Sequence, residues 1–163
     1  MSAPVQVGPV LVPVEQVRAE LGPSALPGTR VVVEWFAALS EGRFDDAWAL
    51  MEPTGPYWLL RQRVAHTNKK FGEIMAGLPG TVFTRPIAWK LGPITEQDDR
   101  VAVVAESYAP LVAGGTYENM YHFLFRVRRG LIEEGYEFAD TFRSAQTFAA
   151  PPGGDGRPVA STT

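Results

Sequence analysis

The spacing of apolar residues divides the chain into a helical first half and a strand-like second half. A short helix is predicted over Val14–Leu21. Apolar residues then recur at i, i+3, i+4 and i+7 within Arg30–Ser40 and again within Phe44–Met51, which is the period of a helix with one buried face. A third, longer helix is predicted from apolar residues that follow one side of the next segment, namely Leu60, Val64, Phe71, Ile74 and Leu78.

Four segments of the second half predict strands. Each is bounded by turn residues and is rich in β-branched or aromatic types. The segments are Thr81–Leu91, Arg100–Ala109, Thr116–Val127 and Leu131–Phe142. Helices followed by strands favour the α+β class, with about three N-terminal helices packed on one face of an antiparallel sheet.

The last two predicted strands each have one aromatic face. At period two, the odd-numbered positions of 116–127 form one such face and the even-numbered positions of 131–142 form the other. A two-residue turn at Arg129-Gly130, or a four-residue loop over 128–131, joins the strands so that both aromatic faces lie on the same side of the sheet. The pairs that this register predicts are Asn119 with Asp140, Tyr121 with Phe138, and Phe123 with Tyr136.

This pairing makes Asp140 and Asn119 the first candidates for chemistry. A carboxylate that is partly withdrawn from water can carry a proton in general acid–base catalysis. Asn119 can orient that carboxylate or donate to a substrate oxygen that gains negative charge. The alternative is that Asp140 lies near the end of the sheet, half solvated or bonded to a helix N-terminus.

Composition excludes several classes of function. The 163 residues include 15 Lys and Arg, 18 Asp and Glu, two His and no Cys, with a net charge of −3. Such a chain lacks the basic stripe that binding to a nucleic acid needs. Without Cys there is no disulfide and no thiolate nucleophile, and two His cannot build a three-His metal site. We therefore expect neither a metal nor a cofactor.

The distribution of residues along the chain predicts one domain. Residues 1–13 form an extended N-terminal segment, residues 14–148 the domain, and residues 149–163 a disordered tail, because this tail is poor in large apolar residues. No apolar run approaches the ~20 residues of a membrane span, and the start does not have the pattern of a secretory signal. A cytoplasmic protein without a membrane or nucleic-acid partner is expected.

Four stretches of the sequence, 32–50, 115–125, 129–132 and 136–141, resemble the SnoaL-like, ketosteroid-isomerase-like branch of the nuclear transport factor 2-like superfamily. The resemblance covers about residues 29–148. It implies a cone, in which a strongly curved antiparallel sheet wraps around the helices and encloses an apolar pocket. It also implies a homodimer formed through the outer face of the sheet.

The resemblance also bears on the chemistry. The three catalytic positions of the steroid isomerases match Trp35, Leu59 and Tyr121, so that two of the three groups are missing here. The Arg and Asp that limonene epoxide hydrolases carry on one strand match Ser107 and Ala109. The last-strand Asp that SnoaL-type polyketide cyclases use as acid and base matches Asp140, which is the analogy that survives.

We therefore expect a small acid–base enzyme that acts on an apolar, carbonyl-bearing molecule by polyketide-like cyclisation, isomerisation or elimination. Asp140 is the expected proton carrier, with Asn119 and Tyr121 as its polar partners. The residues expected to bind the substrate are Trp35, Tyr57, Trp58, Arg85, Trp89, Tyr117, Phe123, Tyr136 and Phe138. The alternative is a non-catalytic protein on the same fold that binds a hydrophobic ligand or assembles with a partner.

Two basic residues have competing interpretations. Arg85 shares an alternating face with Trp89, which would bring it into the pocket, but Pro86 can mark a bulge or an edge that leaves it outside. His122 lies on the face opposite the aromatic one and is expected at the dimer face or the surface, unless a bulge exchanges the faces.

Overall fold

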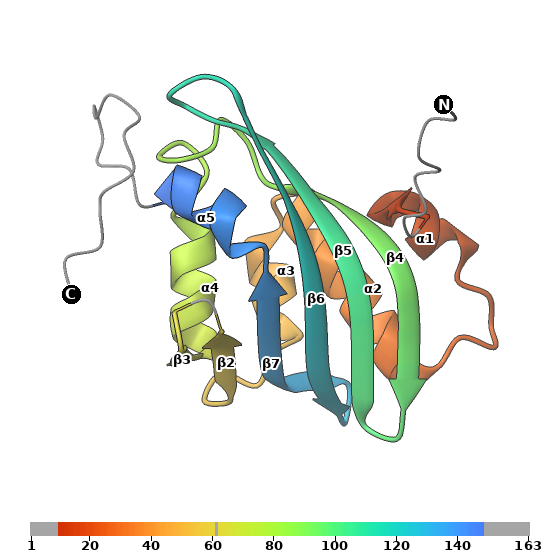
Figure 1. Ribbon diagram of the computed structural model, residues 1–163. Helices are drawn as coiled ribbons and strands as arrows, with labels where there is room; N and C mark the ends of the chain where they lie inside the picture. The colour runs from red at the N-terminus through yellow and green to blue at the C-terminus, as the bar shows by residue number, and fades with distance from the viewer. Residues whose placement is uncertain (1–9, 61, 149–163) are drawn as a thin grey trace, which may run out of the picture.

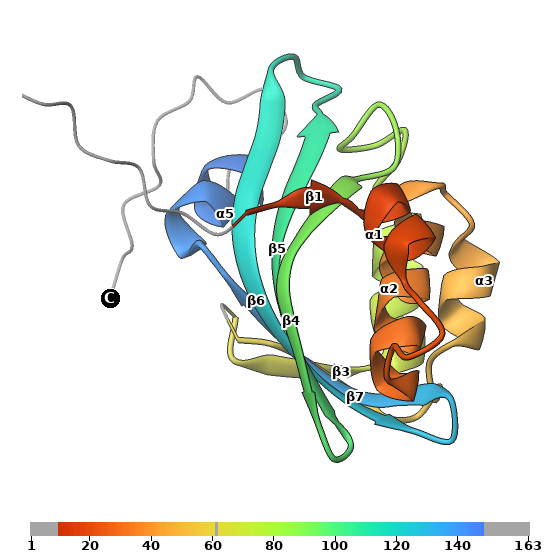
Figure 2. The ribbon, with the colours of Figure 1, turned by 90° about the vertical axis from the view of Figure 1, so that its right-hand side faces the viewer.

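The computed structural model describes residues 10–60 and 62–148, which form a curled sheet around helices (Figures 1 and 2). Within these residues seven strands are ordered β1-β4-β5-β6-β7-β2-β3. The elements in chain order are β1 Val12–Pro13, α1 Val14–Glu20, α2 Pro27–Ser40, α3 Phe44–Ala49, β2 Pro56–Leu59, β3 Val64–Thr67, α4 Asn68–Ala76, β4 Ala88–Gln97, β5 Arg100–Pro110, β6 Thr116–Arg128, β7 Leu131–Ala139 and α5 Thr141–Phe148. The α+β class and the cone-shaped fold are confirmed. The expected tail over 149–163 lies outside the described residues.

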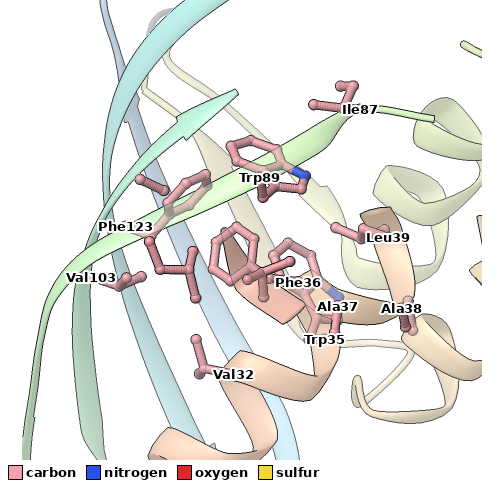
Figure 3. Packing of buried hydrophobic residues seen from close by; sticks show 14 of the residues in the cluster. Val32, Trp35, Phe36, Ala37, Ala38, Leu39, Ile87, Trp89, Val103 and Phe123 are labelled. Atoms are coloured by element: carbon pink, nitrogen blue, oxygen red, sulfur yellow. The ribbon is translucent and has the colours of Figure 1, made fainter. Parts of the chain in front are cut away.

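Helix α2 lies against the concave face of the sheet and supplies the centre of the core (Figures 2 and 3). Its predicted apolar stripe is buried, from Val32 to Leu39. The Phe36 ring lies edge-on to Trp89 of β4 and Phe123 of β6, with centroids 5.1 and 5.2 Å away. Edge-to-face packing of this kind is favourable beyond the area that it buries, so α2 fixes the inner face of β4, β5 and β6.

The predicted third helix is wrong in its first half. Residues 56–59 and 64–67 form an antiparallel hairpin, β2 and β3, and β2 also pairs in parallel with β7 through Tyr57 and Gly135. Strand pairing therefore overrides the helical spacing of the apolar residues, and Val64 is exposed. The helix begins only at Asn68, where the Thr67 hydroxyl accepts a hydrogen bond from the Lys70 amide.

Two predicted strands also have different ends. The first begins at Ala88 rather than Thr81. The last ends at Ala139, and residues that were expected to continue it form α5 instead. The predicted two-residue turn at Arg129-Gly130 is confirmed, with both residues at positive φ, as the tight hairpin turn requires.

The register of the last hairpin differs from the predicted one beyond this turn. Arg128 pairs with Leu131 and Val127 with Ile132, as predicted, but Arg126 pairs with Glu134. Glu133 is therefore an extra residue in β7, a β-bulge, and the inward side of β7 changes from even to odd positions. The predicted pairs of Asn119 with Asp140, Tyr121 with Phe138, and Phe123 with Tyr136 are all wrong; Tyr121 pairs with Ala139 and Phe123 with Glu137.

The bulge moves two expected substrate-binding residues to the outer face of the sheet. Tyr136 stacks there on Trp58, which also faces outward, with ring centroids 6.2 Å apart. Phe138 is exposed beside His122. The predictions that Trp58, Tyr136 and Phe138 line the pocket are therefore wrong, whereas the predicted outer position of His122 is confirmed. The homodimer expected through this face stays a prediction.

Gly135 offers a test of the bulged register. A Cβ on this inward-facing glycine would lie 2.6 Å from two ring carbons of Tyr57. Gly135→Ala should therefore lower the free energy of unfolding by about 1–3 kcal/mol, the usual cost of overpacking a core, measured by urea unfolding. Gly22→Ala is the matched control, because nothing lies within 4 Å of its Cβ. Equal stability of the two variants would contradict the register.

Candidate functional site

A small cavity of about 70 Å³ lies inside the cone, between the sheet, α2, α4 and α5. Its walls are mostly apolar or aromatic, and its hydroxyl and carboxyl groups come from the sheet and α5. The residues that line it are Trp35, Leu39, Tyr57, Phe71, Met75, Leu78, Ile87, Trp89, Tyr117, Tyr121, Phe123, Glu137, Ser144 and Phe148. Among these described lining residues Glu137 is the one carboxylate, and β7 presents it because the bulge turned the odd positions inward.

Tyr57 holds this carboxylate. The Tyr57 hydroxyl donates a hydrogen bond of 3.3 Å to Glu137 Oε2. The Tyr57 ring is fully buried and stacks on Phe71, with centroids 3.6 Å apart. Burial raises the pKa of Tyr57 well above its ordinary value, and the negative charge of Glu137 raises it further. Tyr57 therefore stays protonated at neutral pH and acts as a donor to Glu137.

A second polar group consists of two tyrosine hydroxyls. The hydroxyls of Tyr117 and Tyr121 lie 2.8 Å apart, and the Asn119 side-chain amide donates to the Tyr117 hydroxyl at 2.9 Å. One hydroxyl proton makes the bond between the two tyrosines, so the other is left for a further acceptor. Burial makes the largest contribution to raising the pKa of Tyr121, and the neighbouring Tyr117 and Glu137 raise this pKa further. The pair is therefore a neutral hydrogen-bond donor in a largely apolar space.

Asp140 does not face this cavity. It is exposed, and its Oδ1 accepts hydrogen bonds from the backbone amides of Phe142 at 2.9 Å and Arg143 at 3.4 Å. Asp140 is thus the N-cap of α5, which is the second of the two interpretations of this residue. Asn119 is buried beside it, but its amide reaches the main-chain oxygen of Asp140, at 3.2 Å, rather than the carboxylate.

Of the other ten predicted site residues, the structure brings six together and leaves four outside, namely Arg85 and the three residues of the outer face described above. The six that line the cavity are Trp35, Tyr57, Trp89, Tyr117, Tyr121 and Phe123. Arg85 is exposed, with its guanidinium carbon 5.8 Å from the centre of the Tyr108 ring. Arg85 therefore does not line the cavity, which is what the alternative at Pro86 predicted, and its contact with a substrate stays a prediction.

Two indole N–H groups in the wall of the cavity are buried and have no partner among the described residues, those of Trp35 and Trp89. In Figure 3 the ring nitrogen of Trp89 points towards the side where Leu39 and Ile87 lie, and both of these residues line the cavity. A buried N–H without an acceptor is costly, so each is a candidate donor to a ligand oxygen.

Glu137 and Ser144 also line the cavity, although the sequence pattern did not point to either of them. One signal for Glu137 was the pair Glu133-Glu134 followed by Gly135, because a strict alternation would place Glu134 inside the core. One signal for Ser144 was Asp140 itself, since Asp followed by a short polar and apolar run is typical of a helix start. Ser144 is buried, and its hydroxyl accepts a bond of 2.9 Å from Asn119.

In the described part of the chain, no group of three or more His, Cys, Asp or Glu side chains could hold a metal ion. None of the helices in residues 10–60 and 62–148 has the length and apolar character that crossing a membrane takes.

Comparison with known proteins shows which fold the chain has. No protein-family model matches the sequence, and no curated protein matches it. Solved structures do match, among them an NTF2-like protein of unknown function from Burkholderia pseudomallei, with a TM-score of 0.67, 13% identity, and coverage of 77% of this chain and 100% of that one. An LEH-like epoxide hydrolase from M. tuberculosis has a TM-score of 0.63 and 16% identity, covering 74% of this chain and 88% of the other.

A protein from Jannaschia sp. that is named as a SnoaL-like polyketide cyclase has a TM-score of 0.60 and 20% identity, with coverage of 82% and 99%. At these identities the likeness concerns the fold. The chain has the nuclear transport factor 2-like fold, in the form shared with SnoaL-like and ketosteroid-isomerase-like proteins. This confirms the resemblance found in the sequence.

The raised pKa values of the two tyrosines predict the alkaline stability of the protein. Above the ordinary tyrosine pKa of 10.0, the unfolded chain loses these protons while the folded chain keeps them, so stability falls as pH rises. Each tyrosine contributes a slope that rises towards about 1.4 kcal/mol per pH unit as the unfolded chain loses that proton. Urea unfolding between pH 9 and 11 should show a shallower decline in Tyr121→Phe than in the wild type. Equal slopes would contradict the buried, neutral Tyr121.

Proposed function

We propose that the protein is an acid–base enzyme that acts on a small apolar molecule with a carbonyl group, and that Glu137 carries the proton. The observation that carries this proposal is the position of Glu137, as the one carboxylate among the described residues that line a mostly apolar cavity. The proposed proton carrier is thus Glu137 in place of Asp140, which caps α5.

The chemistry follows from the positions of the polar groups. Glu137 removes a proton from the carbon next to the carbonyl, so the C–H bond breaks and its electron pair moves into the enolate, whose oxygen gains negative charge. The hydroxyl proton left over by the Tyr117–Tyr121 pair stabilises that oxygen. Glu137 then returns the proton to a different atom, which isomerises the molecule, or to the alkoxide that forms when the enolate carbon attacks a second carbonyl, which closes a ring.

Tyr57 has a supporting role in this scheme. Its bond to Glu137 Oε2 fixes the orientation of the carboxylate in the cavity. Because burial and the charge of Glu137 raise the pKa of Tyr57, it does not compete as a base. The proposal is also supported by the fold, since structures that match it include proteins named as a polyketide cyclase and an epoxide hydrolase.

The second candidate is a non-catalytic protein that binds a hydrophobic ligand. The observation in its favour is the bond between Tyr57 and Glu137, since a half-buried carboxylate that is hydrogen-bonded to a tyrosine can also have a purely structural role. Both candidates use the same cavity, and they differ in whether a proton moves.

Proton exchange separates the two candidates. The probe is 2-tetralone, an apolar ketone whose α-protons exchange with D₂O, followed by NMR. The wild type should accelerate this exchange, and Glu137→Gln should lower the rate about 100-fold or more, the usual contribution of a general base. Asp140→Asn is the matched control, because Asn caps a helix as well as Asp does, and it should leave the rate within about twofold.

The remaining outcomes also decide between the candidates. Unchanged exchange in Glu137→Gln would refute the role of Glu137. Binding of 2-tetralone by the wild type without any acceleration would support the non-catalytic candidate. A loss of exchange in Asp140→Asn, with α5 still folded by circular dichroism, would return the role to Asp140.

A further inference from the structure

Helix α5 closes one side of the cavity with a single aromatic ring. Phe148, at its end, lines the cavity together with Ser144 from the same helix. The Phe148 ring lies edge-on to Phe83, with centroids 6.2 Å apart and planes at 90°, and to Tyr117, with centroids 5.4 Å apart and planes at 72°. The ring of this side chain therefore occupies a place that is already shaped for an aromatic ring.

The cavity that Phe148 closes is small for a ligand site. Its volume of about 70 Å³ compares with roughly 300–1,000 Å³ for pockets that bind drug-sized molecules and with the 150 Å³ cavity that holds a benzene. A ring-bearing ligand therefore needs a wall residue to move. The walls from the sheet and α2 are almost fully buried, as Trp35 and Phe123 illustrate, whereas Phe148 is 40% exposed.

The hydrogen bonds that hold α5 in place are also of a kind that can break when a ligand binds. They include the cap made by the Asp140 carboxylate and the hydrogen bond from Asn119 to the Ser144 hydroxyl. Ser144 is the buried residue of the helix, and Phe142 on the same helix is 69% exposed. Moving Phe148 out of the cavity breaks its ring contacts with Phe83 and Tyr117 but leaves the almost fully buried walls from the sheet and α2 in place.

We propose that the Phe148 ring occupies the subsite for an aromatic ring of the ligand, and that the ligand displaces it. The ligand class is then a planar aromatic molecule that carries a hydrogen-bond-accepting oxygen. Tyr117 connects the two parts of this site, because its ring contacts Phe148 and its hydroxyl contacts Tyr121. A ring in the place of Phe148 therefore lies one side chain away from the donor pair. This inference rests on the proposed function, which takes the cavity to be the ligand-binding site.

Ligand affinity tests the displacement directly. Binding of 2-tetralone, which has one aromatic ring and a carbonyl, is measured by quenching of tryptophan fluorescence, since Trp35 and Trp89 line the cavity. Phe148→Ala should bind it about tenfold more tightly than the wild type, because the Phe148 ring no longer competes with the ligand for the subsite. The affinity for saturated 2-decalone, which has the same carbonyl but no aromatic ring, should increase clearly less.

Two further variants keep this test decisive. Phe142→Ala, on the exposed side of the same helix, should leave the affinity unchanged. Phe148→Leu removes the ring but keeps an apolar side chain, which should keep α5 folded. It should show a smaller gain in affinity for 2-tetralone, and it replaces Phe148→Ala in the test if that variant unfolds. Unchanged or weaker binding of 2-tetralone in the Phe148 variants, or an equal gain for both ketones, would overturn the proposal.

The failure of this inference can be distinguished from the failure of the proposed function. A gain in affinity without catalysed proton exchange would retain the aromatic subsite and refute the enzyme. Exchange that depends on Glu137 without a gain in affinity would retain the enzyme and refute the subsite.

Discussion

The β-bulge at Glu133 is the constraint on which the site depends. An uninterrupted hairpin would place Glu134 inside the core opposite Phe125, and a carboxylate there would be removed from water without a partner. The bulge turns Glu134 to the outer face, where Arg100 and Arg126 lie 3.6 and 3.5 Å from its carboxylate. It also turns Gly135 inward, and only a residue without a Cβ leaves room there for the ring of Tyr57.

The change of faces has two consequences for the site. Glu137 moves to the inner side of β7 and meets the Tyr57 hydroxyl. Asp140 moves out of the sheet and begins α5, whose Ser144 and Phe148 complete the wall of the cavity. One extra residue therefore decides both which carboxylate faces the cavity and which element closes it.

The sequence predicted those features that depend on local spacing. The stripe of α2, the strands β5 and β6, the turn at Arg129-Gly130 and the superfamily fold all follow from periodicity, turn residues or family motifs. It did not predict features that depend on contacts distant in the chain. The hairpin of β2 and β3 forms because β2 pairs with β7. The bulge forms because Glu134 meets arginines of β5 and β6, and Tyr57 needs the space at Gly135.

The same distinction between local spacing and distant contacts explains which residues of the candidate site could be predicted. Aromatic residues on β6, such as Tyr117, Tyr121 and Phe123, could be assigned to the inner face by alternation, because β6 keeps its alternation along this stretch. Residues of β7 beyond the bulge could not, because alternation places Tyr136 and Phe138 on the wrong face and Glu137 outside, and it extends the strand to Asp140, which instead caps α5. A single unrecognised residue in a strand reverses every assignment that follows it.

The most direct test of this account is to measure which residues of β6 and β7 pair. Cross-strand nuclear Overhauser contacts in solution report which backbone protons face each other. The bulged register predicts contacts of Phe125 with Gly135 and of Phe123 with Glu137. Contacts of Phe125 with Glu134 and of Phe123 with Tyr136 would show an uninterrupted hairpin, which would place Glu137 outside the cavity and contradict the account.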